Sequence, residues 1–343
     1  GLFVSFFPQL IAGPIVHHQE MMPQFKKDRY LFSHSHMAVG ATIFAIGLFK
    51  KVILADSLAL YATPVFDAVK AGGPVGTLAA WIGVLSYTFQ IYFDFSGYSD
   101  MAIGLGRMFG IKLPLNFNSP YKATGAIEFW RRWHMTLSRM LRDYLYIPLG
   151  GNRRGRIRRY ANVMIVMLLG GLWHGAHWNF VLWGACHGAF LMVNHAWRSA
   201  AKALRWAWAE GALGRQAAWG VTFLGVVLAW VLFRAEGFAA AMRYYREMFV
   251  WSPAAGPYPL KVDHFMAILV SLLFVRLLPN TQEFMQRYQP AVDFDLTRAP
   301  APLRPLRGLR WKPSWVWGLV FGALFSISIF NMTKVTEFLY FQF

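Results

Sequence analysis

The sequence predicts an all-α, polytopic integral membrane protein, and three observations lead to this fold class. Of the 343 residues, 56% are hydrophobic and only 15% are charged, whereas about 25% of residues are charged in soluble domains. Several charge-free intervals reach the length of about 20 residues that a helix needs to cross a bilayer. Lysine and arginine gather between these intervals, as they do in the short loops of membrane proteins.

The charge-free intervals give the predicted membrane spans. Residues 30–49 are followed by two lysines, and the apolar run 52–66 that comes next carries a single aspartate. This stretch is either two broken segments or one helix with a re-entrant piece. Residues 264–275 form a shorter span that would need a flanking charged residue to lie near an interface. The other predicted spans are residues 1–19, 71–93, 160–197 (long enough for two crossings), 216–233 and 313–333.

Loop charge orients these spans, because the lysines and arginines of short loops concentrate on the cytoplasmic side. Residues 150–159, GGNRRGRIRR, hold five arginines and no acid, so we place them in the cytoplasm. The interval 160–197 then leaves and returns as a hairpin. Residues 290–313, rich in proline and arginine, are predicted to be an irregular cytoplasmic linker. The chain, residues 1–343, is predicted to be a single membrane domain.

Charge and cysteine content narrow the classes of function. The net charge of +18 would suit a nucleic-acid-binding protein, but basic inner loops give the same excess in a polytopic membrane protein. We therefore expect no nucleic-acid partner. Cys186 is the single cysteine, which excludes an internal disulfide framework and a metal site built from several cysteines.

Four histidines lie in the charge-free run 160–197, where ionisable groups are functional by default. On a continuous helix that starts after the basic loop, His174 would lie about 22 Å from the cytoplasmic interface, past the midplane. The plainer alternative is a buried histidine bonded to a neighbouring carbonyl. His177 would share a helical face with His174, as metal ligands do, but no acid follows to complete a zinc site, so no metal is expected. The other two are His187 and His195.

A second group of candidate residues lies in 127–151, where apolar and polar stripes alternate with helical spacing. Arg131, His134 and Arg142 belong to the polar stripe. An amphipathic helix on the cytoplasmic membrane surface would explain the arginines. It would not explain His134, because a neutral imidazole adds little to headgroup binding. A polar stripe that lines an internal passage would use both the histidine and the arginines.

Two acidic residues, Asp94 and Asp100, follow a predicted span. Unpaired carboxylates at membrane depth would tend to be neutralised. We therefore predict that they pair with arginines of the polar stripe or with Arg132, rather than act as catalytic acids.

Histidine is the best base that the sequence offers. No GxSxG motif is present, and Cys186 lacks the flanking pattern of a nucleophile. An imidazole with a pKa near 6.5 can deprotonate a hydroxyl as it attacks an acyl carbonyl, then return the proton to the leaving thiolate.

At these residues the chain resembles the membrane-bound O-acyltransferase family, in particular its bacterial branch of alginate O-acetyltransferase-like membrane subunits. The segments that carry the resemblance are SFFPQLIAGPIV, FDFSGYSDMAIGLGRMFGI, FWRRWHMTLSRMLRDYLYIPLGGNRRG, GGLWHGAHWNF, WGACHG, LAWVLFRAEGFAAA, LPNTQEFM and FLYFQF. Family members begin with further transmembrane helices before SFFPQ, so the resemblance implies that the chain is truncated at its N-terminus. It also implies a helical core with a central passage and amphipathic cytoplasmic helices.

The resemblance implies roles for individual residues. The family's invariant histidine corresponds to His174 in WHG, the expected general base, and a second important histidine corresponds to His134 in RRWH. His134 would orient or polarise the donor thioester, and the arginines at 131 and 142 would meet a phosphorylated donor. His187 also matches the family pattern, with a structural or supporting role. Further residues that could shape the substrate pocket are Trp173, Trp178 and Asn179.

The resemblance implies an O-acyltransferase of the bacterial inner membrane that moves an acetyl group from a cytoplasmic thioester to an extracytoplasmic polysaccharide of the alginate type. No bound cofactor is expected, since the thioester, acetyl-CoA or an acyl carrier, is a substrate. Expected partners are membrane lipid and a periplasmic acyltransferase or polymer-synthesis complex. Cellulose, peptidoglycan and D-alanylated teichoic acid remain alternative acceptors. A channel for acyl groups or anions, and a docking scaffold that uses the FLYFQF tail, are the alternatives from other classes.

Overall fold

The computed structural model describes residues 2–10, 12–26, 32–206, 211–253, 260–292 and 310–332. Within these ranges the chain is helical and contains no β-strand, which confirms the all-α fold class. Most of the predicted linker 290–313 and the whole FLYFQF segment lie outside the described residues.

One long helix forms the first layer of the molecule. It consists of α3 (His34–Phe49), the π-helical segment η2 (Lys50–Ala55) and α4 (Asp56–Lys70), which follow one another without a break. Together with α11 (Ala212–Arg234), it is one of the two described helices that are long and apolar enough to cross a membrane. Both alternatives predicted for residues 30–66 are wrong in the described part of this stretch, because the helix continues through Lys50 and Lys51 without a break and without a re-entrant piece.

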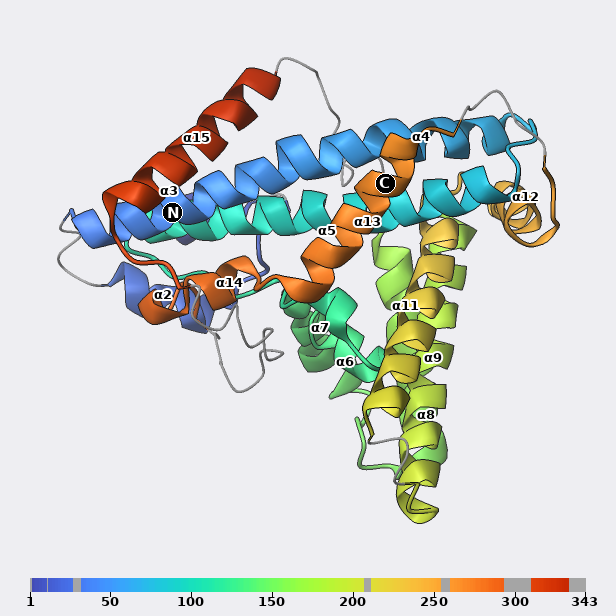
Figure 1. Cartoon of the computed structure of the whole chain (residues 1–343). Helices are drawn as coiled ribbons and strands as arrows, with labels where there is room; N and C mark the ends of the chain where they lie inside the picture. The colour runs from blue at the N-terminus through green and yellow to red at the C-terminus, as the bar shows by residue number, and fades with distance from the viewer. Residues whose placement is uncertain are drawn as a thin grey trace.

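The partner of this long helix is α5 (Thr77–Met108), which runs antiparallel beside it (Figure 1). Glycines set the close approach of the two helices. A Cβ at Gly40 would collide with the carbonyl oxygen of Gly104, and a Cβ at Gly47 with that of Gly97. Small residues at a helix interface let two backbones meet in this way, as is common in membranes.

Two lysine–aspartate pairs, one buried and one partly buried, join these helices near the π-helical segment. The Lys50 ammonium lies 2.6 Å from Asp100, and the Lys51 ammonium lies 2.5 Å from Asp94. The prediction that both aspartates pair with arginines of residues 131–142 is wrong. The antiparallel packing of α5 against the long helix brings the two lysines opposite the aspartates, a contact that local sequence does not reveal.

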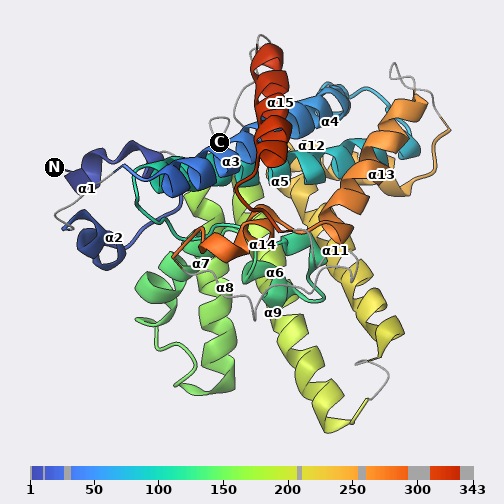
Figure 2. The ribbon, with the colours of Figure 1, turned by 60° about the vertical axis from the view of Figure 1, so that its left-hand side comes forward.

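A second group of helices runs across the first (Figures 1 and 2). It contains α8 (Gly155–Trp173), α9 (Trp178–Ala203) and α11. The first two form an antiparallel hairpin with a short turn, as predicted for residues 160–197. Its contact also depends on glycine, because a Cβ at Gly171 would collide with the Phe180 carbonyl, and one at Gly184 with the Met167 carbonyl.

Short elements lie where the two groups meet. They are η3 (Pro120–Lys122), α6 (Ala126–Trp130), α7 (Met135–Leu141) and the π-helical η4 (Arg142–Tyr146). The prediction of one amphipathic helix over 127–151 is wrong, because the helix ends after Trp130 and starts again at Met135. Between them His134 has a left-handed backbone, with φ at 41°, and a right-handed helix cannot pass through that conformation.

The remaining helices flank these layers. The predicted span 1–19 is wrong, because prolines divide the segment into α1 (Leu2–Ser5), η1 (Phe7–Gln9) and α2 (His18–Phe25). The predicted span 216–233 lies inside α11, whereas the predicted span 71–93 begins before α5 and covers only its first half. The spans predicted at 264–275 and 313–333 match α13 (Val262–Leu277) and α15 (Trp315–Asn331). The other elements are α12 (Phe238–Phe249), α13 (Val262–Leu277), α14 (Thr281–Phe284), η5 (Gln286–Tyr288) and α15 (Trp315–Asn331).

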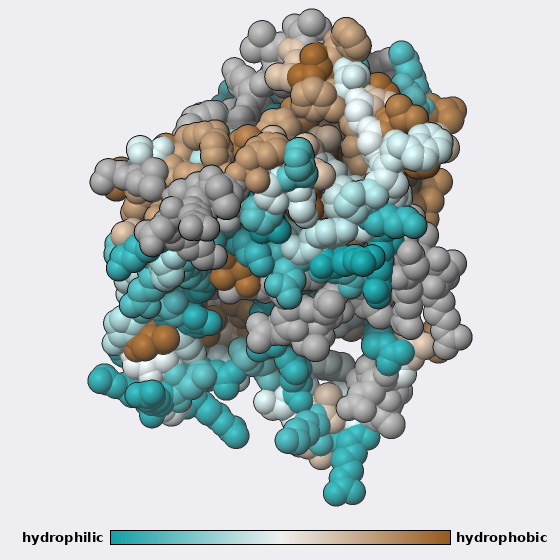
Figure 3. Space-filling model, turned by 90° about the vertical axis from the view of Figure 1, so that its left-hand side faces the viewer, coloured by the Kyte–Doolittle hydropathy of each residue, from teal (hydrophilic) through white to brown (hydrophobic). Residues whose placement is uncertain are grey.

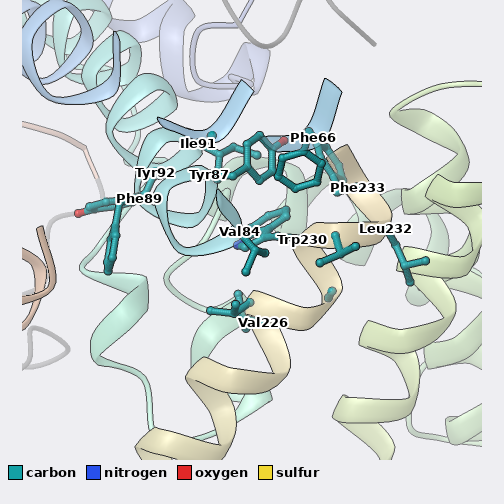
Figure 4. Packing of buried hydrophobic residues seen from close by; sticks show 14 of the residues in the cluster. Phe66, Val84, Tyr87, Phe89, Ile91, Tyr92, Val226, Trp230, Leu232 and Phe233 are labelled. Atoms are coloured by element: carbon teal, nitrogen blue, oxygen red, sulfur yellow. The ribbon is translucent and has the colours of Figure 1, made fainter. Parts of the chain in front are cut away.

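The main core lies at the crossing of α4, α5 and α11. Figure 4 shows Phe66, Tyr87, Trp230 and Phe233 packed there, and all four are almost fully buried. By contrast, α13 and α15 expose many large apolar side chains, such as Phe330, which is 78% exposed. Figure 3 shows hydrophobic residues gathered on the upper part of one face and hydrophilic residues below. This division is typical of a polytopic membrane protein.

Candidate active site

His174 lies at the tip of the α8–α9 hairpin. The helix α8 runs unbroken from Gly155 to Trp173, so the imidazole lies at the end far from the arginine-rich loop, as predicted. His174 is the C-cap residue of α8, and its backbone amide donates a hydrogen bond of 3.0 Å to the Gly171 carbonyl. Its ring lies 5.3 Å from the Trp183 ring and 5.1 Å from the Phe233 ring. The tip of the hairpin therefore inserts the imidazole among aromatic side chains of α9 and α11.

His134 is 3% exposed and occupies the N-cap position of α7. Its Nδ1 lies 3.1 Å from Oδ1 of Asn116. That oxygen also accepts hydrogen bonds from the backbone amide and the hydroxyl of Thr136, while the Asn116 amide nitrogen donates to the Ser99 hydroxyl. The backbone donor fixes which Asn116 atom is oxygen. Because the oxygen can only accept, Nδ1 of His134 carries the proton and Nε2 is the acceptor nitrogen of the neutral ring.

The two predicted catalytic histidines meet at Trp173. The indole ring centroid lies 6.1 Å from that of His134 and 5.1 Å from that of His174. The imidazoles are close enough to interact electrostatically. Trp173 is 47% exposed, so this meeting point lies at the boundary of the protein interior. The structure thus brings together three residues of the predicted site, from the start of α7 and the end of α8.

His187 is 1% exposed and belongs to the same aromatic cluster. Its Nδ1 accepts a hydrogen bond of 3.3 Å from the Trp130 indole. The His187 ring stacks on Phe129, with 8° between the planes, and its centroid lies 4.8 Å from that of Trp183. Trp183 in turn contacts His174. The chain of contacts from His187 to His174 therefore passes through a tryptophan that the sequence did not single out.

Sequence reasoning missed Asn116 and Trp183. Trp183 and His187 are four residues apart on α9, and this spacing places them on one face of a helix. That spacing is a local signal that points to Trp183. Asn116 carries no such signal, because its contact with His134 depends on how an extended segment packs against the start of α7.

Three predicted pocket residues lie apart from this cluster. Arg142 is exposed and lies 2.7 Å from Asp143, and its hydrogen bond lowers the pKa of the Asp143 carboxyl. Trp178 is 75% exposed. Asn179 is buried, and its amide donates to the Ala235 carbonyl at 2.7 Å, which ties α9 to the end of α11. His177 caps α9 by accepting from the Asn179 backbone amide.

Arg131 belongs to a basic cluster at the other end of the hairpin. It is exposed, and together with Arg159 and Arg198 it lies close enough to His195 for their charges to act on that imidazole. Arg159 contacts His195 directly, with 2.6 Å between Nη2 and Nδ1. These residues come from the end of α6, the start of α8 and the end of α9. Within the described part of the chain, no group of three or more His, Cys, Asp or Glu side chains is placed to hold a metal ion.

Comparison with known proteins places this arrangement in a family. A sequence model of the membrane-bound O-acyltransferase family matches residues 2–233. The chain belongs to this family. The matched region contains α8, α9, all of α11 except its last residue, and every histidine of the aromatic cluster.

Curated relatives of this membrane-bound O-acyltransferase include a peptidoglycan O-acetyltransferase from Helicobacter pylori, which is 52% identical over 72% of the chain and 46% of the relative. A probable alginate O-acetylase AlgI from Pseudomonas aeruginosa is 38% identical over 99% of the chain and 70% of the relative. A teichoic acid D-alanyltransferase from Bacillus subtilis is 26% identical over 60% of the chain and 53% of the relative. The chain spans about half the length of most of these curated relatives.

Proposed function

We propose that this membrane-bound O-acyltransferase transfers an acetyl group from a cytoplasmic thioester to a hydroxyl group of an extracytoplasmic polysaccharide. The observation that carries the proposal is the meeting of His134 and His174 at Trp173. The family match and the names of the Helicobacter and Pseudomonas relatives support acetyl transfer and a polysaccharide acceptor. We further propose that the protein lies in the bacterial inner membrane and works with a periplasmic acyltransferase or a polymer-synthesis complex.

In the proposed reaction, His174 acts as the general base. Its imidazole takes the proton of the acceptor hydroxyl while the hydroxyl oxygen attacks the thioester carbonyl carbon. A C–O bond forms, the C–S bond breaks, and the imidazolium returns the proton to the departing thiolate. His174 lies at the hairpin tip, far from the arginine-rich loop. This position suits a base that receives the acceptor from the extracytoplasmic face of the membrane, opposite the loop.

His134 positions the donor in this proposal. Because Nδ1 donates to Asn116, Nε2 accepts a hydrogen bond and cannot give one to the thioester carbonyl. The tautomer therefore favours orientation of the donor over polarisation of its carbonyl. Of the polar stripe predicted around His134, Arg142 has no part in this proposal, since Asp143 holds it.

We propose that a phosphorylated donor enters at the basic cluster of Arg131, Arg159 and Arg198. Arginine binds phosphate through several N–H groups at once, which makes such a cluster suited to a donor of the coenzyme A type. His187 and His195 are eight residues apart on α9, which is about 12 Å along a helix. A long donor can thus hold its phosphates at the cluster while its thioester reaches the aromatic site.

The proposal is tested with the full-length protein purified in detergent, where both faces are accessible. It is incubated with radiolabelled acetyl-CoA and either alginate or peptidoglycan glycan strands, and the label on each polymer is counted. We expect label on one of the two polymers. If label is transferred only from a D-alanyl thioester to teichoic acid, the acceptor class changes. If no donor and acceptor pair gives either acyl transfer or donor hydrolysis, the channel or scaffold alternatives are favoured.

A further inference from the structure

We propose that the side-chain N–H groups of Trp183 and His187 bind the carbonyl oxygen of the acyl group during its transfer. This inference rests on the proposed function and adds what the two catalytic candidates lack. His174 acts as a base, and His134 presents an acceptor nitrogen, so neither supplies a hydrogen-bond donor to the carbonyl. Such donors are needed because the oxygen gains negative charge as the hydroxyl attacks.

The first observation is that both N–H groups are buried without an acceptor. Trp183 and His187 are each 1% exposed. Among the residues that the structure describes, none forms a hydrogen bond with Nε1 of Trp183 or with Nε2 of His187. A buried donor without a partner costs about 1–3 kcal/mol, and such groups are rare enough in native proteins to require an explanation. Two of them side by side point to a ligand atom that accepts from both.

The second observation fixes His187 as a donor. The Trp130 indole N–H can only donate, and it lies 3.3 Å from Nδ1 of His187. Nδ1 of the neutral imidazole therefore carries the lone pair, and the proton lies on Nε2. The stacking of the ring on Phe129 holds this orientation. Trp130 thus positions His187, and the unpartnered nitrogen is the one that carries hydrogen.

The third observation is the place of this pair in the fold. Trp183 and His187 lie one turn apart on α9, with ring centroids 4.8 Å apart. The Trp183 ring also lies 5.3 Å from His174 and nearly perpendicular to it, at 88°. The Trp183 ring therefore contacts both the proposed base and His187. Acyl transfer requires such a juxtaposition, since the base deprotonates the hydroxyl that attacks the carbonyl carbon while the donors bind the oxygen of the same carbonyl group.

The acceptor oxygen bonds to the carbonyl carbon as His174 takes the hydroxyl proton, and the C=O π electrons move to the oxygen. The N–H groups of Trp183 and His187 hold this oxyanion. The C=O bond then re-forms, the C–S bond breaks, and the proton passes from His174 to the thiolate.

The test removes one donor and keeps its ring. In Trp183→Phe the indole N–H is lost, and we expect kcat to fall by about 10²–10³-fold while KM for the donor stays near that of the wild type. Because the lost N–H has no acceptor, the melting temperature should stay equal or rise. The matched control is Trp230→Phe. Its N–H donates to the Tyr121 hydroxyl at 3.2 Å, so this variant should melt earlier while kcat changes little.

A second pair of variants tests His187. Glutamine can place an amide N–H in the same region, whereas leucine cannot, so His187→Gln should keep more of the wild-type kcat than His187→Leu. A wild-type kcat in Trp183→Phe would overturn the inference and leave the proposed function intact. So would a kcat that falls only in step with the melting temperature, because the indole would then be structural. A wild type without acyl transfer would overturn the proposed function and this inference together.

Discussion

Nδ1 of His134 lies 3.1 Å from the side-chain oxygen of Asn116, and the histidine makes this contact from a left-handed backbone conformation. The same asparagine accepts from Thr136, and its backbone carbonyl accepts from Met135. Asn116 therefore holds the start of α7 and the imidazole that caps it. Strained backbone at such a position is often retained where it serves a site.

The cost of this backbone conformation is measured by two variants that both remove the imidazole. His134→Gly and His134→Ala lose the same hydrogen bond, but only glycine adopts positive φ without strain. We expect the glycine variant to be more stable than the alanine variant by about 1 kcal/mol, in denaturation of the purified protein. Both should lose acyl transfer. Equal stabilities would show that the left-handed conformation carries no strain.

The buried ion pair of Lys50 and Asp100 is predicted to be a strong determinant of stability. Asp100 also accepts from Thr281 and Gln282. Asp100→Asn leaves the lysine charge buried and should lower the free energy of unfolding by about 3–5 kcal/mol. The control is Lys70→Met, which breaks an exposed pair with Glu236 and should cost less than about 1 kcal/mol. Similar losses in the two variants would contradict this account.

The glycine contact between α8 and α9 gives a third prediction. Gly184→Ala puts a methyl group against the Met167 carbonyl, so the helices must separate and the tip that carries His174 must move. We expect a marked loss of thermal stability and of acyl transfer. Gly220→Ala on α11 is the control, because nothing lies within 4 Å of its Cβ position. It should be neutral or stabilise by up to about 1 kcal/mol.

The basic cluster predicts where the donor phosphates bind. The double variant Arg131→Gln/Arg198→Gln should raise KM for acetyl-CoA about tenfold, a loss of about 1.4 kcal/mol, with kcat little changed. The rise should shrink at high salt, because both arginines are exposed. Arg142→Gln is the matched control, since Asp143 already holds that arginine. An equal rise in KM for the control would remove the basis for placing the donor at this cluster.

The parts of the fold that the sequence predicts are those with a local cause. Charges bracket the interval 160–197, so the hairpin and the far position of His174 follow from composition and loop charge. Hydrophobicity likewise predicts the core of α11, although it does not reveal that prolines break the first predicted span into short helices.

The parts that escape prediction depend on distant contacts. The break at His134 is set by Asn116, and the partners of Asp94 and Asp100 are set by how α5 packs against the long helix. Helical periodicity in 127–151 is real, but it continues through a residue whose backbone leaves the helix. For the site, sequence motifs lead to His134, His174 and His187. The four-residue spacing from His187 places Trp183 on the same helix face, but the contact of Trp183 with His174 depends on how α8 and α9 pack.

The most direct test of the proposed activity compares two histidines from the same turn. His174→Gln removes the proposed base, whereas His177→Asn replaces an exposed N-cap histidine with a residue that also caps helices well. Both purified full-length variants are assayed for acetyl transfer from labelled acetyl-CoA to the polymer that the wild type modifies, with melting temperatures as a control for folding. The account predicts a loss of at least about 10²-fold for His174→Gln and near wild-type transfer for His177→Asn. Near wild-type transfer by a folded His174→Gln protein would contradict it.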